Sequence, residues 1–131
     1  MKITADTNVL VRALTDDHIE QSRAARIALG KADMVALTIP TLCELVWVLR
    51  SYRIPSSDIA RTLRGLLDGA NIAVNRPAAE AGLAVLETGG DFADGVIAYE
   101  GSWLGADTFV SFDKKAVSLI EAQGRSARLL A

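Results

Sequence analysis

The sequence predicts an α/β domain in which a mainly parallel sheet is covered by helices on both faces. Three observations support this fold class. Short apolar runs alternate with helical stretches along the whole chain, and no repeat or linker interrupts them. Half of the 131 residues are hydrophobic, which is enough to bury a core. The length fits a single domain over residues 1–131.

Five short apolar runs have the length and content of buried strands. The expected strands cover residues 2–5, 34–39, 71–74, 108–112 and 127–130. Helical stretches separate them, at about residues 9–14, 18–29, 40–53, 57–69, 77–89, 91–105 and 113–123. Right-handed crossovers place the ends of parallel strands, and the starts of the helices that follow, at one carboxyl edge. Ligands of such folds bind at that edge.

Caps and helix breakers set the limits of the expected helices. Asp6 is a good N-cap for the first helix, and Gly30 is expected to stop the second. Pro40 and Pro77 each open a helix, because a missing backbone N–H costs nothing in the first turn. Ser57–Asp58 is expected to cap the fourth helix.

The composition excludes several classes of protein. Fourteen basic and sixteen acidic residues give a net charge of -2, so bulk positive charge cannot drive binding to a polyanion. Bound metal ions can supply that charge, so an enzyme acting on nucleic acid stays possible. Cys43 is the only cysteine, which excludes an internal disulfide and a cysteine-based zinc site. No apolar run approaches the length of a membrane span, and Asp6 stands where a signal peptide is apolar. We therefore expect a cytoplasmic protein.

Four acidic residues, far apart in the sequence, are predicted to meet at the carboxyl edge of the sheet. Asp6 follows the first expected strand and Asp113 the fourth, while Glu44 and Asp94 lie near the starts of helices. Like charges about 4 Å apart repel by roughly 4 kcal/mol at an effective dielectric constant of 20, so such a cluster needs a cation. Oxygen ligands without His or Cys favour Mg²⁺ or Mn²⁺ over zinc. A cation of this kind suits phosphoryl chemistry.

Each acid also has a purely structural interpretation. Asp6 and Asp113 are possible N-caps, and Asp94 is a first-turn acid of the kind that the helix dipole favours. Glu44 has only apolar neighbours in the sequence, which indicates a partnered or functional charge. The coincidence of all four at one edge favours the functional interpretation.

These residues resemble the motifs of the PIN-domain nucleases. The resemblance rests on four segments in order: Asp6-Thr7-Asn8 after the first strand, Glu44 in Pro40-Thr-Leu-Cys-Glu-Leu, Asp91-Phe-Ala-Asp94-Gly-Val-Ile-Ala, and Val110-Ser-Phe-Asp113. It covers nearly the whole chain, and the length is similar to that of VapC-type toxins from bacterial toxin–antitoxin pairs.

The resemblance implies an Mg²⁺- or Mn²⁺-dependent endoribonuclease with the strand order 3-2-1-4-5. It implies that Asp6 and Asp94 are the main metal ligands, that Asp113 completes the cluster, and that Glu44 orients or deprotonates the attacking water. Two supporting residues are implied as well: the Ser111 hydroxyl would form a hydrogen bond within the site, and Asn8 would brace the pocket. Asp91 is either the N-cap of its helix or a fifth acid of the pocket.

The resemblance also implies protein partners, namely a second copy of the chain and an antitoxin segment. Apolar residues surround the axis of the expected helix 40–53, so we expect it to be buried on nearly all sides. Either a central position against the sheet or a face covered by another chain explains such a helix.

Basic and aromatic residues allow two interpretations each. The arginines near Pro55 can contact RNA phosphates or lie on solvated helix faces; they are Arg50, Arg53, Arg61 and Arg64. The aromatic residues on helices can stack on RNA bases, but core packing is the favoured interpretation; they are Trp47, Tyr99 and Trp103. His18, the only histidine, is expected to start a helix.

Two other functions compete with the nuclease. A phosphatase similar to the haloacid dehalogenases needs an acid two residues after its first aspartate, and Asn8 occupies that position. A catalytically silent module that binds RNA or protein would tolerate loss of the four acids, yet all four are present.

Overall fold

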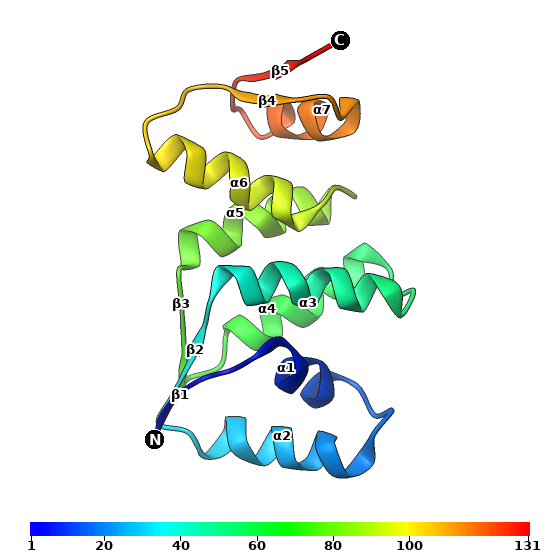
Figure 1. The fold of residues 1–131 in the computed structure, drawn as a ribbon, viewed down its shortest axis with the longest axis vertical. Helices are drawn as coiled ribbons and strands as arrows, with labels where there is room; N and C mark the ends of the chain where they lie inside the picture. Colours follow the sequence, from blue (N-terminus) through cyan, green and yellow to red (C-terminus); the bar gives the residue numbers. More distant parts are fainter. The chain divides into compact units, whose positions relative to one another are not determined.

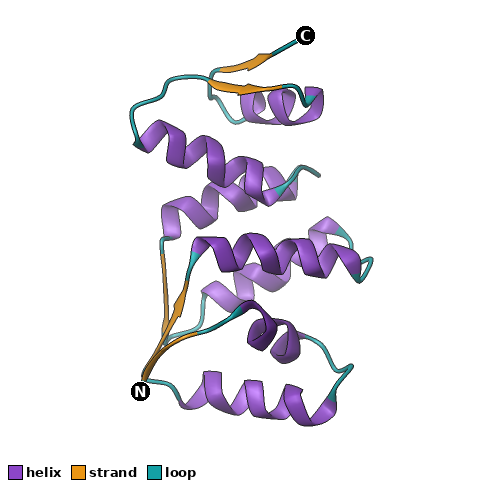
Figure 2. Ribbon diagram, viewed as in Figure 1, coloured by secondary structure: helices purple, strands orange, loops and turns teal.

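The computed structural model describes the whole chain, Met1–Ala131. It divides into two compact units, Met1–Asn75 and Arg76–Ala131. Figure 1 labels their helices and strands, and Figure 2 shows that short strands alternate with longer helices in each unit. This alternation confirms the predicted α/β class. No helix is long and apolar enough to cross a membrane.

The first unit contains three parallel strands and four helices. They are β1 (Lys2–Thr4), α1 (Thr7–Leu14), α2 (Ile19–Lys31), β2 (Met34–Leu37), α3 (Ile39–Ser51), α4 (Ser56–Leu67) and β3 (Ile72–Val74). Strand β2 lies between β1 and β3, with Ile3 opposite Val35 and Ala36 opposite Ala73. This arrangement confirms the 3-2-1 part of the expected strand order.

The second unit contains two parallel strands and three helices. They are α5 (Arg76–Glu87), α6 (Phe92–Trp103), β4 (Phe109–Ser111), α7 (Lys114–Ala122) and β5 (Ala127–Leu129). Val110 of β4 lies opposite Arg128 of β5, which confirms the 4-5 part of the order. The pairing of the first strand with the fourth, and a single domain over residues 1–131, stay predictions.

Each unit has apolar side chains that are fully buried. In the first unit Leu10 of α1, Val35 of β2 and Leu42 of α3 are among them. In the second, the ring of Phe92 packs where Gly82 of α5 has no side chain, so the two helices come close together. Burial of this kind is the main favourable term in folding and holds the strand ends of each unit in place.

Three element limits differ from the expected ones, and a local hydrogen bond explains the first of them. The second strand ends at Leu37 instead of residue 39, because Thr38 caps α3 through a hydrogen bond from the Thr41 amide. Helix α2 passes through Gly30 to Lys31, so the expected stop was wrong. The expected cap at Ser57–Asp58 was also wrong: α4 begins at Ser56, after Pro55, with no side-chain cap.

Helix α3 is not buried on nearly all sides, so that expectation was wrong. One side of it is buried, through Leu42, Leu45, Val46 and Leu49. The opposite side carries Glu44 and Trp47, and both side chains are exposed. Hence Glu44 is a charge on the exposed side of an otherwise apolar helix, with no cost of burial.

Candidate functional site

Asp6 lies at the point where β1 ends and α1 begins. Its side chain is exposed, and its Oδ1 accepts a hydrogen bond of 2.8 Å from the Thr7 amide, which makes it the N-cap of α1. The cap prediction for Asp6 is thus confirmed. The cap holds the carboxylate at the carboxyl edge of the three-stranded sheet, where the topology predicted it.

Glu44 is connected to the same place through Thr7. The Thr7 hydroxyl donates a hydrogen bond of 3.3 Å to Oε1 of Glu44, although the two residues are 37 positions apart. Thr7 itself is buried, so it joins the start of α1 to the second turn of α3 beneath the two exposed acids. The structure therefore brings Asp6 and Glu44 together within the first unit.

Sequence reasoning gave Thr7 no role. The only signal in the sequence was that a threonine stands between two motif residues, Asp6 and Asn8. Threonine is a common residue, so this position alone does not indicate a role. Only the tertiary position of α3 shows what the hydroxyl contacts. Asn8 is exposed and helps to line a groove of about 490 Å³ between α1 and α2, with Val9 and Arg12 beside it. Its bracing role stays a prediction.

Asp91 and Asp94 occupy different places at the start of α6 in the second unit. Asp91 is the N-cap, since its Oδ1 accepts a hydrogen bond of 3.1 Å from the Ala93 amide. Asp94 is half-buried in the first turn, and its amide donates to the Asp91 carbonyl at 3.1 Å. The cap interpretation of Asp91 is confirmed, while Asp94 lies within the first turn of the helix that Asp91 caps.

Asp113 and Ser111 form a tight turn between β4 and α7. Oδ1 of Asp113 accepts hydrogen bonds from the amides of Lys115 at 2.9 Å and Ala116 at 3.1 Å, so Asp113 caps α7. The Ser111 hydroxyl accepts a hydrogen bond of 2.9 Å from the Asp113 amide. The polar side chains of this turn thus lie at the carboxyl end of β4, as the topology predicted.

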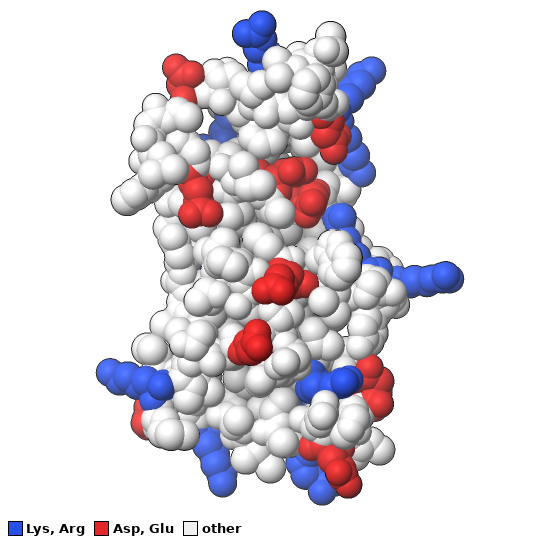
Figure 3. All heavy atoms as spheres, viewed as in Figure 1, with Lys and Arg blue, Asp and Glu red and all other residues white.

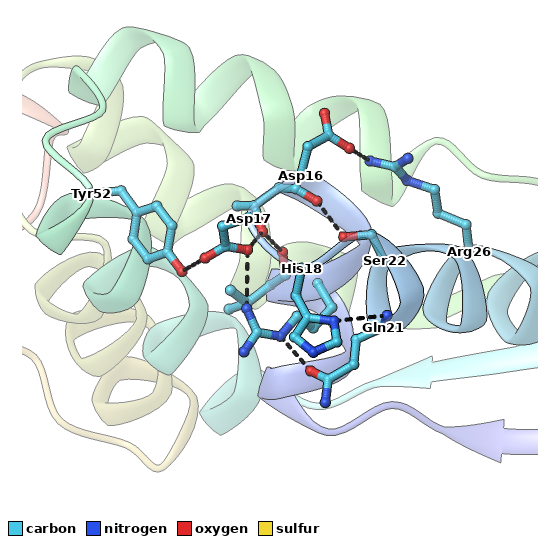
Figure 4. A network of polar contacts seen from close by, with 10 residues as sticks. Asp16, Asp17, His18, Gln21, Ser22, Arg26 and Tyr52 are labelled. Atoms are coloured by element: carbon cyan, nitrogen blue, oxygen red, sulfur yellow. Dashed lines mark hydrogen bonds and ion pairs between the residues drawn. The ribbon is translucent and has the colours of Figure 1, made fainter.

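The four acids are suited to a hard cation by their chemistry. They are carboxylates, and no cysteine or histidine accompanies them: Cys43 is half-buried on α3, and His18 caps α2 by accepting from the Gln21 amide at 3.1 Å (Figure 4). Oxygen donors of this kind fit Mg²⁺ or Mn²⁺. Neither unit by itself gathers three or more His, Cys, Asp or Glu side chains that could hold a metal ion.

A second polar network joins the loop between α1 and α2 to the end of α3 (Figure 4). Asp17 accepts hydrogen bonds from the hydroxyl groups of Tyr52 and Thr15 and forms an ion pair with Arg12 at 3.0 Å. The hydrogen bond from Tyr52 is the largest of the causes that hold the pKa of Asp17 below its ordinary value. The same bond raises the pKa of Tyr52. All of these groups are at least partly exposed, so the network connects the loop to the end of α3 at the surface.

The arginines near Pro55 do not share one structural role. Arg61 forms an exposed ion pair with Asp58 at 3.0 Å, and Arg53, two residues after the end of α3, lies in the left-handed backbone region with φ at 61°. On the face drawn in Figure 3, basic and acidic side chains are interspersed in both units. No continuous basic surface on that face identifies a polyanion site by charge.

Comparison with known protein families bears on both the fold and the activity. Residues 3–119 match the PIN domain. The chain belongs to the PIN-domain family. PIN domains are generally nucleases that use divalent metal ions, so the match supports nuclease activity and argues against a phosphatase of the haloacid-dehalogenase type. A comparison with curated proteins found no match.

Proposed function

We propose that this PIN-domain protein is an Mg²⁺- or Mn²⁺-dependent endoribonuclease whose metal ligands are Asp6, Asp94 and Asp113. The observation that carries the proposal is the Thr7 contact, which joins Asp6 to Glu44 at the carboxyl edge of the first sheet. The family match over residues 3–119 supports it. So does the position of Asp94 and Asp113 at helix starts of the second unit.

Each acid has a distinct part in the proposed hydrolysis. When bound, the metal ion neutralises the scissile phosphate and lowers the pKa of a water molecule. Glu44 takes the proton of the attacking water as a general base, which requires a carboxylate that is exposed and held in one orientation. Its exposure and the hydrogen bond from Thr7 meet both requirements. Ser111 supports Asp113 through the backbone of the turn.

The proposal extends to the biological role and the partners. The length and the order of the motifs resemble those of VapC-type toxins, so we propose that a cognate antitoxin neutralises the nuclease in the cytoplasm and that the chain forms a homodimer. Sedimentation across micromolar concentrations tests the dimer, and a monomer throughout would contradict it.

The nuclease is tested by cleavage of a panel of transfer RNAs and other structured RNAs. The reactions contain Mg²⁺, Mn²⁺ or EDTA, and wild type is compared with Asp94→Asn. We expect cuts that need the metal and are absent from the variant. If the folded, antitoxin-free protein cuts nothing, calorimetric titration with Mn²⁺ decides further. Absence of carboxylate-dependent binding would identify a silent binding module and contradict the proposal.

A further inference from the structure

An aromatic side chain is exposed beside the proposed acids in each unit. Trp47 on α3 is 74% exposed, and Phe112 between β4 and α7 is 75% exposed. Core packing, the favoured interpretation of Trp47, was therefore wrong. Aromatic side chains of this size normally bury much of their surface, so their position on the surface calls for an explanation.

Trp47 follows Glu44 by three residues on the exposed side of α3. Residues at this spacing in a helix have Cβ atoms about 5–6 Å apart, so the indole lies directly beside the proposed general base. Arg50 is exposed and follows three residues later. The side of α3 that carries Glu44 therefore presents a flat apolar ring with a cation close by.

Phe112 has the same setting in the second unit. It stands between Ser111 and Asp113, and the hydrogen bond from the Asp113 amide to the Ser111 hydroxyl closes the turn that carries the ring. The cap that Asp113 forms on α7 fixes the turn from the other side. Lys114 and Lys115, both exposed, come next. An exposed ring, a carboxylate and cations are again neighbours.

Trp103 is a third exposed aromatic residue, but its surroundings differ from those of Trp47 and Phe112. It is 77% exposed, but it ends α6, whose last turn carries no basic residue. Helix α6 leads into the amino end of β4, so Trp103 lies away from the start of the helix, where Asp94 is placed. Exposure alone is therefore shared by all three rings, and only Trp47 and Phe112 combine it with a proposed catalytic acid and a cation.

We propose that Trp47 and Phe112 are stacking platforms for unpaired bases of the RNA substrate, each beside the proposed acid of its own unit. Every base has a π-face, and stacking on an aromatic side chain is sequence-tolerant. A base within a duplex has both faces covered, so only unpaired nucleotides fit such a platform. The neighbouring phosphates are contacted by the exposed cations Arg50, Lys114 and Lys115. Because the chain is acidic overall, it needs such local positive charges to bind RNA. This inference rests on the proposed ribonuclease function.

The binding test uses a fluorescein-labelled oligoadenylate of about ten nucleotides, within the range that single-stranded sites cover. Fluorescence anisotropy is measured with Mg²⁺ in an Asp94→Asn background, which prevents cleavage. Stacking is worth about 1–3 kcal/mol per base, so Trp47→Ala and Phe112→Ala are each expected to raise Kd about 5- to 150-fold. Trp47→Phe keeps a ring and is expected to stay near the parent, and Trp103→Ala is the matched control with unchanged Kd.

The chain contains two tryptophans, Trp47 and Trp103, which allows a direct optical test. With Trp103→Phe, only Trp47 emits, and we expect the oligoadenylate to quench it. With Trp47→Phe, only Trp103 emits, and we expect no quenching. In cleavage assays with Asp94 intact, Trp47→Ala is expected to raise KM while kcat changes little, a split that general misfolding does not produce.

Four results would overturn the inference. The first is binding of RNA with unchanged Trp47 emission and with unchanged Kd in both alanine variants. The second is loss of self-association in Trp47→Ala without loss of RNA affinity, which would assign the ring to an interface with a second copy. The third is a wild type that neither binds nor cuts RNA; if it also lacks carboxylate-dependent Mn²⁺ binding, the proposed function is overturned too. The fourth is cleavage of RNA by both alanine variants as fast as by the wild type, which would contradict the stacking and leave the proposed function intact.

Discussion

Replacing Gly95 with alanine tests the closest helix contact of the second unit. Gly95 is buried in α6, next to Asp94, where α6 crosses α5. A Cβ atom at this position would lie 2.9 Å from the Cα atom of Gly82 and closer still to the carbonyl oxygen of Ala81. These are backbone atoms, so no side-chain rotation relieves the overlap. Helix α6 would have to move away from α5, and Asp94 would move with it.

The magnitude follows from two opposing effects. Overpacking costs about 1–3 kcal/mol, and contact with backbone on the facing helix places Gly95→Ala at about 2–3 kcal/mol. Alanine regains about 0.5–1 kcal/mol over glycine inside a helix. The expected net loss in the free energy of unfolding is therefore about 1–2.5 kcal/mol.

Gly101→Ala is the matched control, because Gly101 lies in the same helix and a Cβ atom there meets nothing within 4 Å. This variant is expected to gain about 0.5–1 kcal/mol. The helix-propensity effect is common to both variants, so their difference measures the overpacking alone, about 2–3 kcal/mol. For a chain of this length that difference separates the Tm values by roughly 6–15 °C.

Urea unfolding followed by circular dichroism measures the two free energies without reference to activity. Equal shifts of the same sign in both variants would refute the reasoning, because they would show that α5 and α6 do not approach each other at Gly95. If Gly95→Ala is destabilised as expected, the proposed nuclease should also lose activity at temperatures where the variant is still folded, because Asp94 is displaced.

Two further predictions concern Asp113 and the contact between Asp17 and Tyr52. Asparagine caps helices as well as aspartate does, so Asp113→Asn is expected to keep the stability and to lose metal-dependent cleavage, whereas Asp113→Ala also loses about 0.5–2 kcal/mol in urea unfolding; equal stability of the two variants would contradict the cap. The pKa of Asp17 is lowered from an ordinary 3.8, chiefly by the hydrogen bond from Tyr52, so the stabilisation is present above that value and is lost as the pH falls through the folded pKa. The pKa of Tyr52 is raised from 10.0, so its stabilisation is present below that value and is lost as the pH rises through the folded pKa; urea unfolding of Tyr52→Phe should differ from wild type at neutral pH and converge with it at both extremes.

Much of the fold was predictable because local signals and topology agreed. The starts of α1 and α7 follow from the N-caps at Asp6 and Asp113, and the strands are short apolar runs that only a sheet can bury. The order within each group of strands followed from the family resemblance, and the parallel pairings bear it out. Where the second strand ends earlier than expected, the unforeseen cap at Thr38 overrides the local rule.

The exposed side of α3 could not be predicted from its sequence. Apolar residues lie all around the helix, so periodicity does not show which side faces the core. The buried side contains leucine and valine, and the exposed one contains Glu44 and Trp47. The same ambiguity hid the contact between Thr7 and Glu44, because hydrogen bonds over 37 positions depend on how the helices pack.

The structure also changes how the acids themselves are interpreted. For Asp6 and Asp113, capping a helix and holding a metal ion were weighed in the sequence as alternatives, yet one carboxylate has two oxygen atoms. In both residues it is Oδ1 that accepts the amide hydrogen bonds of the cap. The other oxygen is not used by the cap, so it is left for a ligand. A cap that restrains the carboxylate also lowers the entropy it loses on binding metal, so fold and proposed chemistry depend on one hydrogen-bonding arrangement.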